Sequence, residues 1–232
     1  RTCFWKDGRL LATGKDGRAH LDAYLDDHAF LIAALLEMLQ ADFRIEDLAF
    51  ARELADALLE NFEDRQLGGF FFTRHDHETL IHRPKPGHDN AMPAGNAVAA
   101  WSLQRLAQLC GEQRYAEAAE RTLRLFQAQM LQQPSGCASM LRALEEWLTP
   151  RRLILLRGPA DQVAEWQERL ARLVLPDAQI LGLPNAINDL PEVLRKPEST
   201  HVNAWVCSGV TCLTPIESWM ELDRILKHGF LL

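Results

Sequence analysis

Hydrophobic and polar positions along the first half of the chain repeat with the period of an α-helix. Residues 24–41 (YLDDHAFLIAALLEMLQA) are apolar on nearly all sides after two acidic residues, a pattern that predicts a buried helix. Residues 46–62 (EDLAFARELADALLENF) keep their apolar positions on one side, which predicts an amphipathic outer helix. Asp26 and Asp27 fall in the first turn of the buried helix, where carboxylates favour the positive end of the helix dipole.

The same two patterns return in the same order further along the chain. Residues 93–110 (PAGNAVAAWSLQRLAQLC) again have a wide apolar surface, and residues 115–130 (YAEAAERTLRLFQAQM) are again one-sided. Residues 136–148 (GCASMLRALEEWL) begin a third copy. When His28 is aligned with Asn96, the apolar positions that follow coincide, so the sequence indicates an internal repeat of helical hairpins.

Helical hairpins that repeat in one phase bury their apolar faces by stacking on their neighbours. The sequence therefore predicts a mainly α fold, with residues 1–150 forming part of an α/α toroid, which is a ring of helical hairpins. A plain helical bundle is the alternative. Between the first two hairpins, two β-prone runs flank a polar turn, and we expect a β-hairpin over residues 69–83. This connection is long for neighbouring helices, and long ordered loops often carry function.

The pattern changes after residue 150. Residues 152–158 (RLILLRG) and 178–184 (AQILGLP) are apolar runs on either side of an amphipathic helix, and residues 201–207 (HVNAWVC) are typical of a third strand. We therefore expect residues 151–232 to form a small α/β segment packed on the toroid. The turn after the first run lacks the glycine spacing of a phosphate-binding loop, so no nucleotide site is predicted.

The composition narrows the class of protein. The chain has 232 residues, of which 47% are hydrophobic and 25% charged, and a formal net charge of -7. No basic face appears at helical spacing, which argues against nucleic acid as a partner, and no apolar run is long enough to span a membrane. Five cysteines, an odd number, fit a reducing compartment, so we expect a cytoplasmic location. The first residues lack a start methionine and a signal peptide, and we expect the chain to begin inside a longer protein.

The acidic and amide residues at the predicted helix starts are the first candidates for a site. The common phase of the repeats places Asp26, Asp27, Asp89 and Asn96 at one end of the inner helices. Two carboxylates in different environments can divide acid and base work on a sugar. In the alternative interpretation Asp26 and Asp27 cap a helix, and Asp89 closes a turn. If Asp89 binds a sugar, Asp89→Asn should remove the sugar's effect and leave the melting temperature nearly unchanged.

Histidines and aromatic residues supply further candidates. The run HDHE at 75–78, with His82 and His88 nearby, allows a metal site, a catalytic base beside a sugar carbonyl, or a solvated turn. The pattern does not choose among these histidines and His28, and we predict no metal site and no cofactor. Phe72 is a candidate for stacking on a sugar ring, although such residues are more often part of the core.

Cys207 and Cys212 are the candidates for redox chemistry. Four residues separate them in CSGVTC, which differs from the spacing of a thioredoxin-type pair or a zinc site. They can form a disulfide, act as a redox relay, or remain two reduced thiols, which a reducing compartment favours.

Several separated segments of the chain resemble one family. AYLDDHAFLIAALLEMLQ, GGFFFTRHDHETLIHRPK, HDNAMPAGNAVAA and VNAWVCSGVTCLTPIESW are similar to bacterial thioredoxin-domain-containing proteins related to mammalian spermatogenesis-associated protein. The resemblance implies an N-terminal thioredoxin-like domain joined to a toroid like those of N-acylglucosamine 2-epimerase and six-hairpin glycosidases. This chain would be the C-terminal part, so the thioredoxin-like domain and the other half of the ring would be its partners. The residues that this chain shares with the family are Asp26, Asp27, Asp89, Pro93, Gly95 and Asn96. At position 28 the chain has histidine, whereas the family usually has tyrosine.

Together these observations predict a carbohydrate-active domain that binds, isomerises or hydrolyses a sugar in the toroid cavity. The alternative is a non-catalytic interaction scaffold, or a redox-linked one, that pairs with a thioredoxin-like domain. The candidate residues are, for catalysis, Asp26, Asp27, Asp89 and His28; for substrate binding, His88, Asn90, Gly95, Asn96 and Phe72; and for redox chemistry, Cys207 and Cys212.

Overall fold

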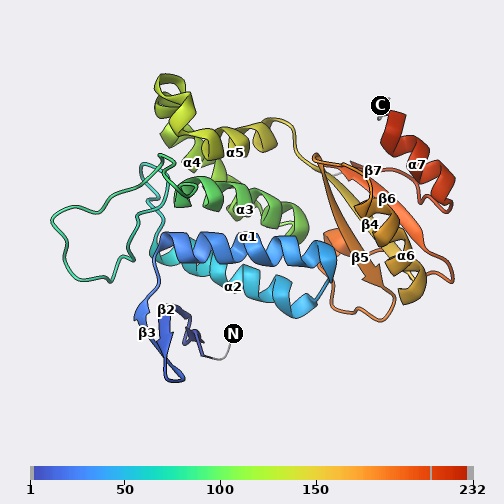
Figure 1. The fold of residues 1–232 in the computed structure, drawn as a ribbon, viewed down its shortest axis with the longest axis horizontal. Coiled ribbons are helices and arrows are strands. Elements are labelled where there is room, and N and C mark those ends of the chain that lie inside the picture. The colour runs from blue at the N-terminus through green and yellow to red at the C-terminus, as the bar shows by residue number, and fades with distance from the viewer. Residues whose placement is uncertain (1–2, 210, 229–232) are drawn as a thin grey trace. The chain divides into compact units, whose positions relative to one another are not determined.

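The computed structural model describes residues 3–209 and 211–228 (Figure 1). The chain divides into two compact units. The first unit comprises Arg1–Glu37 and Glu46–Thr149, and the second comprises Met38–Ile45 and Pro150–Leu232. Helices account for 48% and strands for 17% of the structure, in a three-stranded and a four-stranded sheet. The fold is therefore mixed α/β, and the expected mainly α toroid is wrong.

An antiparallel sheet at the N-terminus is one reason for this correction. Its strands are β1 (Trp5–Lys6), β2 (Arg9–Lys15) and β3 (Arg18–Asp22), in the order β1-β2-β3. The two turns have the same sequence, Lys-Asp-Gly-Arg, and both central residues of each turn have positive φ (51° and 75°, then 52° and 73°). Asp-Gly in this conformation matches the twist of paired strands. The repeated KDGR motif is therefore the sequence signal for this sheet.

Five α-helices form the rest of the regular structure of the first unit. They are α1 (Leu25–Ala41, whose last residues belong to the second unit), α2 (Ile45–Asn61), α3 (Gly95–Cys110), α4 (Gln113–Gln132) and α5 (Ala138–Leu148), with a short 3-10 helix η1 (Pro134–Gly136) before α5. α3 packs against both α4 and α5. Small residues along α3, from Ala97 to Ala100, are buried, which lets neighbouring helices approach closely.

Residues 69–83 form no hairpin, so that prediction is wrong. The connection from α2 to α3 is an ordered loop (Figure 1), whose backbone contains only an isolated bridge between Glu63 and Phe70. The physical reason is that its aromatic residues have different partners. Phe70 is fully buried, Phe71 lies under the guanidinium of Arg83 at 4.1 Å, and the Phe72 ring stacks on Tyr24 at 4.8 Å. The backbone of Phe72 likewise pairs with Pro84 and Leu25 rather than with a second strand.

A buried ion pair joins three helices of the first unit. Arg105 on α3 is 2% exposed, and its Nε donates to Glu146 Oε1 on α5 at 2.7 Å. Its Nη1 donates to Glu37 Oε1 on α1, also at 2.7 Å. Trp101 adds an N–H bond to Glu146 Oε2 at 2.7 Å and lies against the Arg105 guanidinium. Because Arg105 and Glu146 are both buried, removal of either one leaves the charge of the other buried without its main partner, whereas Glu37 is half exposed.

The second unit contains a four-stranded mixed sheet in the order β5-β4-β6-β7. Its strands are β4 (Arg152–Gly158), β5 (Ala178–Pro184), β6 (Asn203–Ser208) and β7 (Thr211–Cys212), and its helices are α6 (Ala160–Ala171), η2 (Glu192–Leu194) and α7 (Trp219–His228). β4 and β5 are parallel and joined through α6, because parallel neighbours require a crossover. β6 runs antiparallel to β4. Ile154, Leu156, Val163 and Trp166 lie in the core formed by the sheet and its helices.

None of the helices in the described ranges combines the length and apolar character that crossing a membrane requires.

We predict that Arg105→Met lowers the free energy of unfolding by about 3–5 kcal/mol, because the Glu146 carboxylate loses its buried counter-charge. The double variant Arg105→Met/Glu146→Leu should recover most of this loss. Urea denaturation measures both values. As the control, Arg172→Met removes an exposed i,i+4 pair with Glu168 and should cost no more than about 0.5 kcal/mol. An Arg105 variant as stable as the Arg172 variant would contradict the assignment.

Candidate functional site

Three helices begin at the same end of the first unit, beside the loop of residues 62–94 (Figure 1). They are α1, α3 and α5, the helices that carry the sequence repeat. The side chain of Asp26 on α1 lies against Gly95 at the start of α3, where any Cβ would overlap the Asp26 carboxylate. Position 95 therefore requires glycine, because the Asp26 carboxylate lies too close to leave room for a Cβ atom. This contact brings Asp26 and Asn96 to one end of the helices.

Asp89 joins the starts of two helices. Its Oδ1 accepts the N–H of Ala94, the residue before α3, and its Oδ2 accepts the N–H of Ser139 in α5, both at 2.8 Å. A carboxylate at this position satisfies backbone donors that have no partner inside their helices and also favours the positive ends of the helix dipoles. Both of its oxygens are thus engaged within the protein. This geometry favours the capping interpretation of Asp89 over contact with a ligand.

Asn96 is also engaged within the protein. It is fully buried, and its Oδ1 accepts the N–H of Phe70 at 2.7 Å. Its Nδ2 donates to the carbonyl oxygens of Phe70 and Pro86, both at 2.9 Å. With both N–H donors and the carbonyl oxygen bonded, Asn96 holds the 62–94 loop on α3 rather than presenting an amide to solvent.

His28 lies inside α1 and has no exposed surface. Its Nδ1 bonds the carbonyl oxygen of Tyr24 at 2.9 Å, so Nδ1 carries the proton, and the buried Nε2 has no hydrogen-bond partner. Burial lowers the pKa of His28, the hydrogen bond to Tyr24 opposes this, and the nearby charge of Arg74 lowers it further. His28 is therefore a neutral, buried ring that a ligand in solution does not reach.

The remaining residues proposed for substrate binding are dispersed. Phe72 stacks face to face on Tyr24. The His88 ring lies over Gly136 in η1, and its Nδ1 is 3.5 Å from Nε2 of Gln129. Asn90 is exposed. No group of three or more His, Cys, Asp or Glu side chains lies together as a metal site within residues 3–209 and 211–228.

Asp26 and Asp27 line an open pocket of about 530 Å³ in the first unit. The Oδ1 atom of Asp26 is buried and has no hydrogen-bond partner. Burial raises the pKa of Asp26, and the neighbouring Asp27 raises it further. Asp27 Oδ2 accepts the N–H of Tyr24 at 2.8 Å and so caps α1. The two carboxylates therefore have different environments, although both residues line one pocket.

The other walls of this pocket are apolar and come from elements that the sequence analysis did not connect. The N-terminal sheet supplies one wall, and the Trp5 ring meets Phe50 of α2 edge-on at 5.5 Å between centroids. The apolar lining residues are Phe4, Trp5, Leu10, Leu11, Phe30, Leu31, Phe50 and Met92. The two KDGR turns were the available signal, because they predict the hairpins that carry Trp5 and Leu10.

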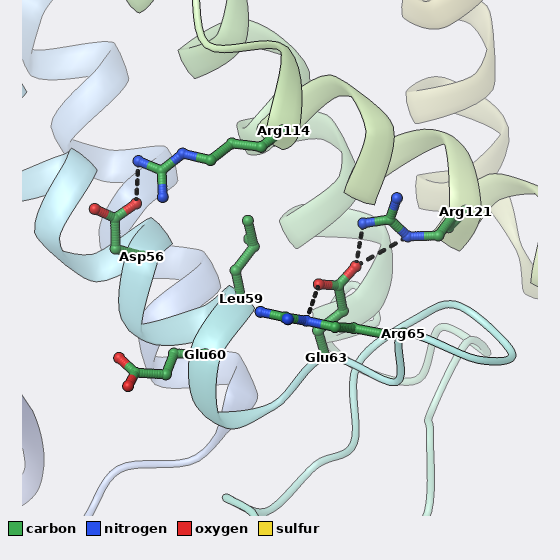
Figure 2. Close-up of a pocket in the computed structure, with 7 residues that line it drawn as sticks. All are labelled: Asp56, Leu59, Glu60, Glu63, Arg65, Arg114 and Arg121. Carbon is green, nitrogen blue, oxygen red and sulfur yellow. Dashed lines mark hydrogen bonds and ion pairs between the residues drawn. The ribbon is translucent and has the colours of Figure 1, made fainter.

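A second pocket, of about 710 Å³, lies between α2 and α4 and is lined mainly by charged side chains (Figure 2). Its charges form pairs. Arg114 bonds Asp56 at 2.8 Å, and Arg121 bonds the buried Glu63 at 2.5 Å. Arg65 lies 3.8 Å from the other oxygen of Glu63. Since each arginine already has a carboxylate partner, this pocket is better explained as a contact that fastens α2 to α4.

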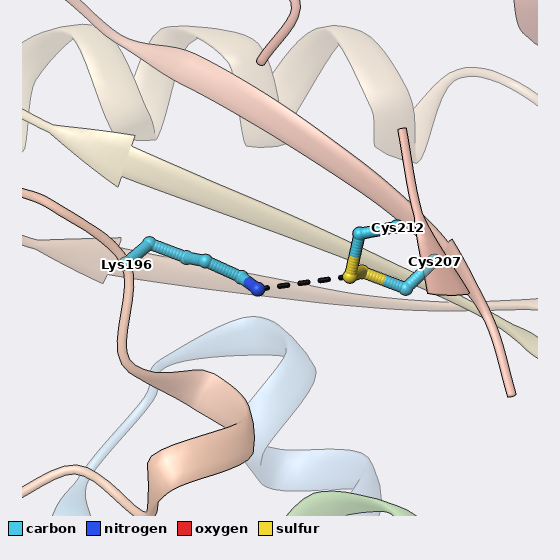
Figure 3. Close-up of a disulfide and its surroundings, with 3 residues drawn as sticks. All are labelled: Lys196, Cys207 and Cys212. Carbon is cyan, nitrogen blue, oxygen red and sulfur yellow. Dashed lines mark hydrogen bonds between the residues drawn. A yellow bond between two sulfur atoms is a disulfide. The ribbon is translucent and has the colours of Figure 1, made fainter. Parts of the chain in front are cut away.

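Cys207 and Cys212 are joined by a disulfide between β6 and β7 in the second unit (Figure 3). Of the alternatives that the sequence leaves open for these cysteines, the structure contains the disulfide rather than two reduced thiols. The Lys196 side chain extends toward the sulfurs, and its Nζ lies 3.6 Å from Cys212 Sγ. Cys207 is 4% exposed, whereas Cys212 is partly exposed.

We predict that Asp89→Asn lowers the free energy of unfolding by about 2 kcal/mol, because an amide offers one acceptor to two helix N–H groups. This loss of stability differs from the nearly unchanged melting temperature that the sequence analysis expects for Asp89→Asn. Chemical denaturation checks the value. Asn90→Ala, an exposed neighbouring change, should stay within about 0.5 kcal/mol of the parent, and equal stability of the two variants would exclude the bridging role.

Similarity to known proteins extends along nearly the whole chain. No protein-family model matches the chain. Human spermatogenesis-associated protein 20 is 28% identical over 97% of the chain, and its rat counterpart is 26% identical over 98%. An uncharacterized protein of Caenorhabditis elegans is 24% identical over 92% of the chain.

The chain spans about 30% of the length of each of these relatives. The matched segment includes both units of the structure. The similarity to proteins with the same name in human, rat and mouse supports a relationship between this chain and the spermatogenesis-associated protein 20 family.

Proposed function

We propose that the pocket beside Asp26 and Asp27 binds a small sugar-like molecule. The observation that carries this proposal is that Asp26 lines a pocket with an aromatic wall, while its Oδ1, buried against Gly95, has no hydrogen-bond partner. A carboxylate accepts hydrogen bonds from sugar hydroxyls, while the apolar face of a sugar ring packs on aromatic side chains. The volume of about 530 Å³ is within the usual range for small-molecule sites.

The energetic position of Asp26 supports a role in binding. A raised pKa means that the protein disfavours its ionised form, and no internal hydrogen bond to Oδ1 offsets this cost. Asp89, a structural carboxylate in the same unit, differs from Asp26 because each of its two oxygens accepts a hydrogen bond from a backbone N–H group. Groups with perturbed pKa values in clefts are typical of ligand sites.

The two aspartates are suited to different tasks if the bound sugar reacts. Asp26 retains its proton to higher pH than an ordinary aspartate, so it is the candidate proton donor in an isomerisation or hydrolysis. Asp27 is held in place by the Tyr24 N–H and is the candidate acceptor. Division of acid and base roles between carboxylates in different environments is common in sugar chemistry.

The proposal extends to the longer proteins that the chain resembles. A thioredoxin-like domain as partner and a cytoplasmic location belong to this proposal, and they rest on the resemblance of the separated motifs and on the cysteine content. The sugar pocket itself depends on neither, because its lining residues all lie within the first unit.

We predict that Asp26→Asn stabilises the unliganded protein at neutral pH. Below the ordinary pKa of 3.8, the carboxyl is protonated in both the folded and the unfolded state, so parent and variant should be equally stable. As the pH rises from there through the raised pKa of the folded state, the parent loses stability and the variant does not. Denaturation midpoints between pH 3 and pH 8 measure this difference.

The matched control for this experiment is Asp42→Asn, which removes the same charge from an exposed position. It should show no comparable gain at neutral pH. A loss of stability in Asp26→Asn at pH 7 would show that the carboxylate has a stabilising structural partner instead.

We predict that some sugars in a panel of mono- and disaccharides raise the melting temperature of the full chain. A ligand at one hundred times its Kd stabilises the folded state by about 2.7 kcal/mol. Trp5→Ala and Asp26→Asn should each reduce the shift, and Asp42→Asn should retain it. Small primary amines form the second arm, because acids and aromatic rings also bind cations. The proposal would be overturned if only amines raised the melting temperature, or if no sugar in the panel raised it.

A further inference from the structure

We propose that the Cys207–Cys212 disulfide is redox-active and exchanges with a small thiol that carries a carboxylate, bound in the basic pocket beside it. This pocket has a volume of about 290 Å³ and lies within the second unit. Its charged lining residues are Arg157, Asp189, Arg195, Lys196 and Glu198. The inference is separate from the sugar proposal, which concerns the first unit.

Lys196 connects the pocket to the disulfide. It lines the pocket, and its Nζ is 3.6 Å from Cys212 Sγ (Figure 3). An ammonium group beside a sulfur favours the thiolate form of that cysteine, so Lys196 favours Cys212 as the departing thiolate in the second step of the exchange. The pocket and the disulfide therefore share the Lys196 side chain, whose ammonium lies beside the sulfur that a ligand thiolate would attack.

The pocket also has a buried positive charge suited to an anion. Arg157 is 4% exposed, and its Nη atoms donate to backbone carbonyls, the shortest bond being 2.8 Å to Pro184. Its buried Nε has no hydrogen-bond partner. The nearest carboxylate oxygen, on Glu198, is 3.9 Å away on a largely exposed side chain. Carbonyl dipoles leave the guanidinium charge incompletely balanced, which favours a carboxylate on the ligand.

The two sulfurs differ in access, and this sets the order of steps. Cys212 is partly exposed and Cys207 is buried, so a ligand thiolate attacks Cys212 Sγ. The ligand sulfur–Cys212 bond forms, the Cys207–Cys212 bond breaks, and Cys207 leaves as a thiolate that takes up a proton.

A second ligand thiolate completes the exchange. It attacks the ligand sulfur of the mixed disulfide, and Cys212 leaves as a thiolate beside the Lys196 ammonium. Burial lowers the pKa of Lys196, so its proton passes more readily to the departing sulfur. Two ligand thiols become one ligand disulfide, and the protein disulfide becomes two thiols. The proton of the first ligand thiol reaches Cys207 through solvent, and the proton of the second restores the Lys196 ammonium after Lys196 has protonated Cys212.

A purely structural role explains this disulfide less well. The two cysteines are five positions apart and already face each other across the β6–β7 ladder. A crosslink over so short a loop removes little freedom from the unfolded chain. The other cysteines in the described ranges, Cys3, Cys110 and Cys137, are not crosslinked.

The test compares the rates at which thiols of different charge reduce the disulfide in the full chain. The protein carries Cys3→Ser, which removes an exposed thiol. The probes are mercaptoacetate, 2-mercaptoethanol and cysteamine at equal thiolate concentrations, and alkylation followed by mass spectrometry measures the free thiols of Cys207 and Cys212. Mercaptoacetate should react about tenfold faster than cysteamine at low salt, and the ratio should fall as salt is added.

Variants locate the source of this selectivity. Lys196→Gln should reduce the preference for mercaptoacetate, because only Arg157 and Arg195 then remain as positive charges in the pocket lining, and Lys196→Arg should keep it. Lys227→Gln is the matched control, because it removes an equal charge from an exposed pair with Asp223, and it should leave the ratio unchanged. The proposal is overturned if cysteamine reacts as fast as mercaptoacetate, if Lys196→Gln keeps the ratio, or if the air-oxidised protein has no Cys207–Cys212 bond.

Discussion

Backbone groups at the starts of the buried helices need partners, and this requirement organises the first unit. The first turn of a helix leaves N–H groups without partners inside the helix, and burial makes that costly. One carboxylate, that of Asp89, serves both α3 and α5, while the amide of Asn96 bonds the loop backbone at Phe70 and Pro86. The loop is consequently ordered without strands of its own, and its order brings Met92 to the pocket near Asp26.

The helical part of the fold could be predicted because its signals are local. The apolar pattern of residues 24–41 and 93–110 identifies α1 and α3, and the repeat phase correctly indicates that these two helices begin at one end. Local patterns could not show whether residues 69–83 form a hairpin. Their β-prone composition is real, but Phe70 is buried against the helices and Phe72 pairs with Pro84 and Leu25, contacts that no local pattern reports. The toroid failed for the same reason, since ring closure depends on contacts between distant segments.

The candidate site was only partly visible in the sequence for a related reason. The rule that carboxylates favour helix starts selects Asp26 and Asp27. The same rule selects Asp89, both of whose carboxylate oxygens accept hydrogen bonds from helix backbone N–H groups. Only the hydrogen-bond partners distinguish an engaged carboxylate from one with an unpaired oxygen. The aromatic wall was missed because Trp5 and Phe50 are far apart in the sequence, although the Asp-Gly turns predict the strands that carry Trp5.

The contact between Asp26 and Gly95 has a consequence for how this protein tolerates change. Since a Cβ at position 95 would overlap the Asp26 carboxylate, alanine at 95 fits only beside a smaller residue at 26. The two positions are therefore epistatic: each restricts the substitutions that the other accepts. Divergent homologues should vary at 26 and 95 together, so covariation between these two columns would be a record of the contact.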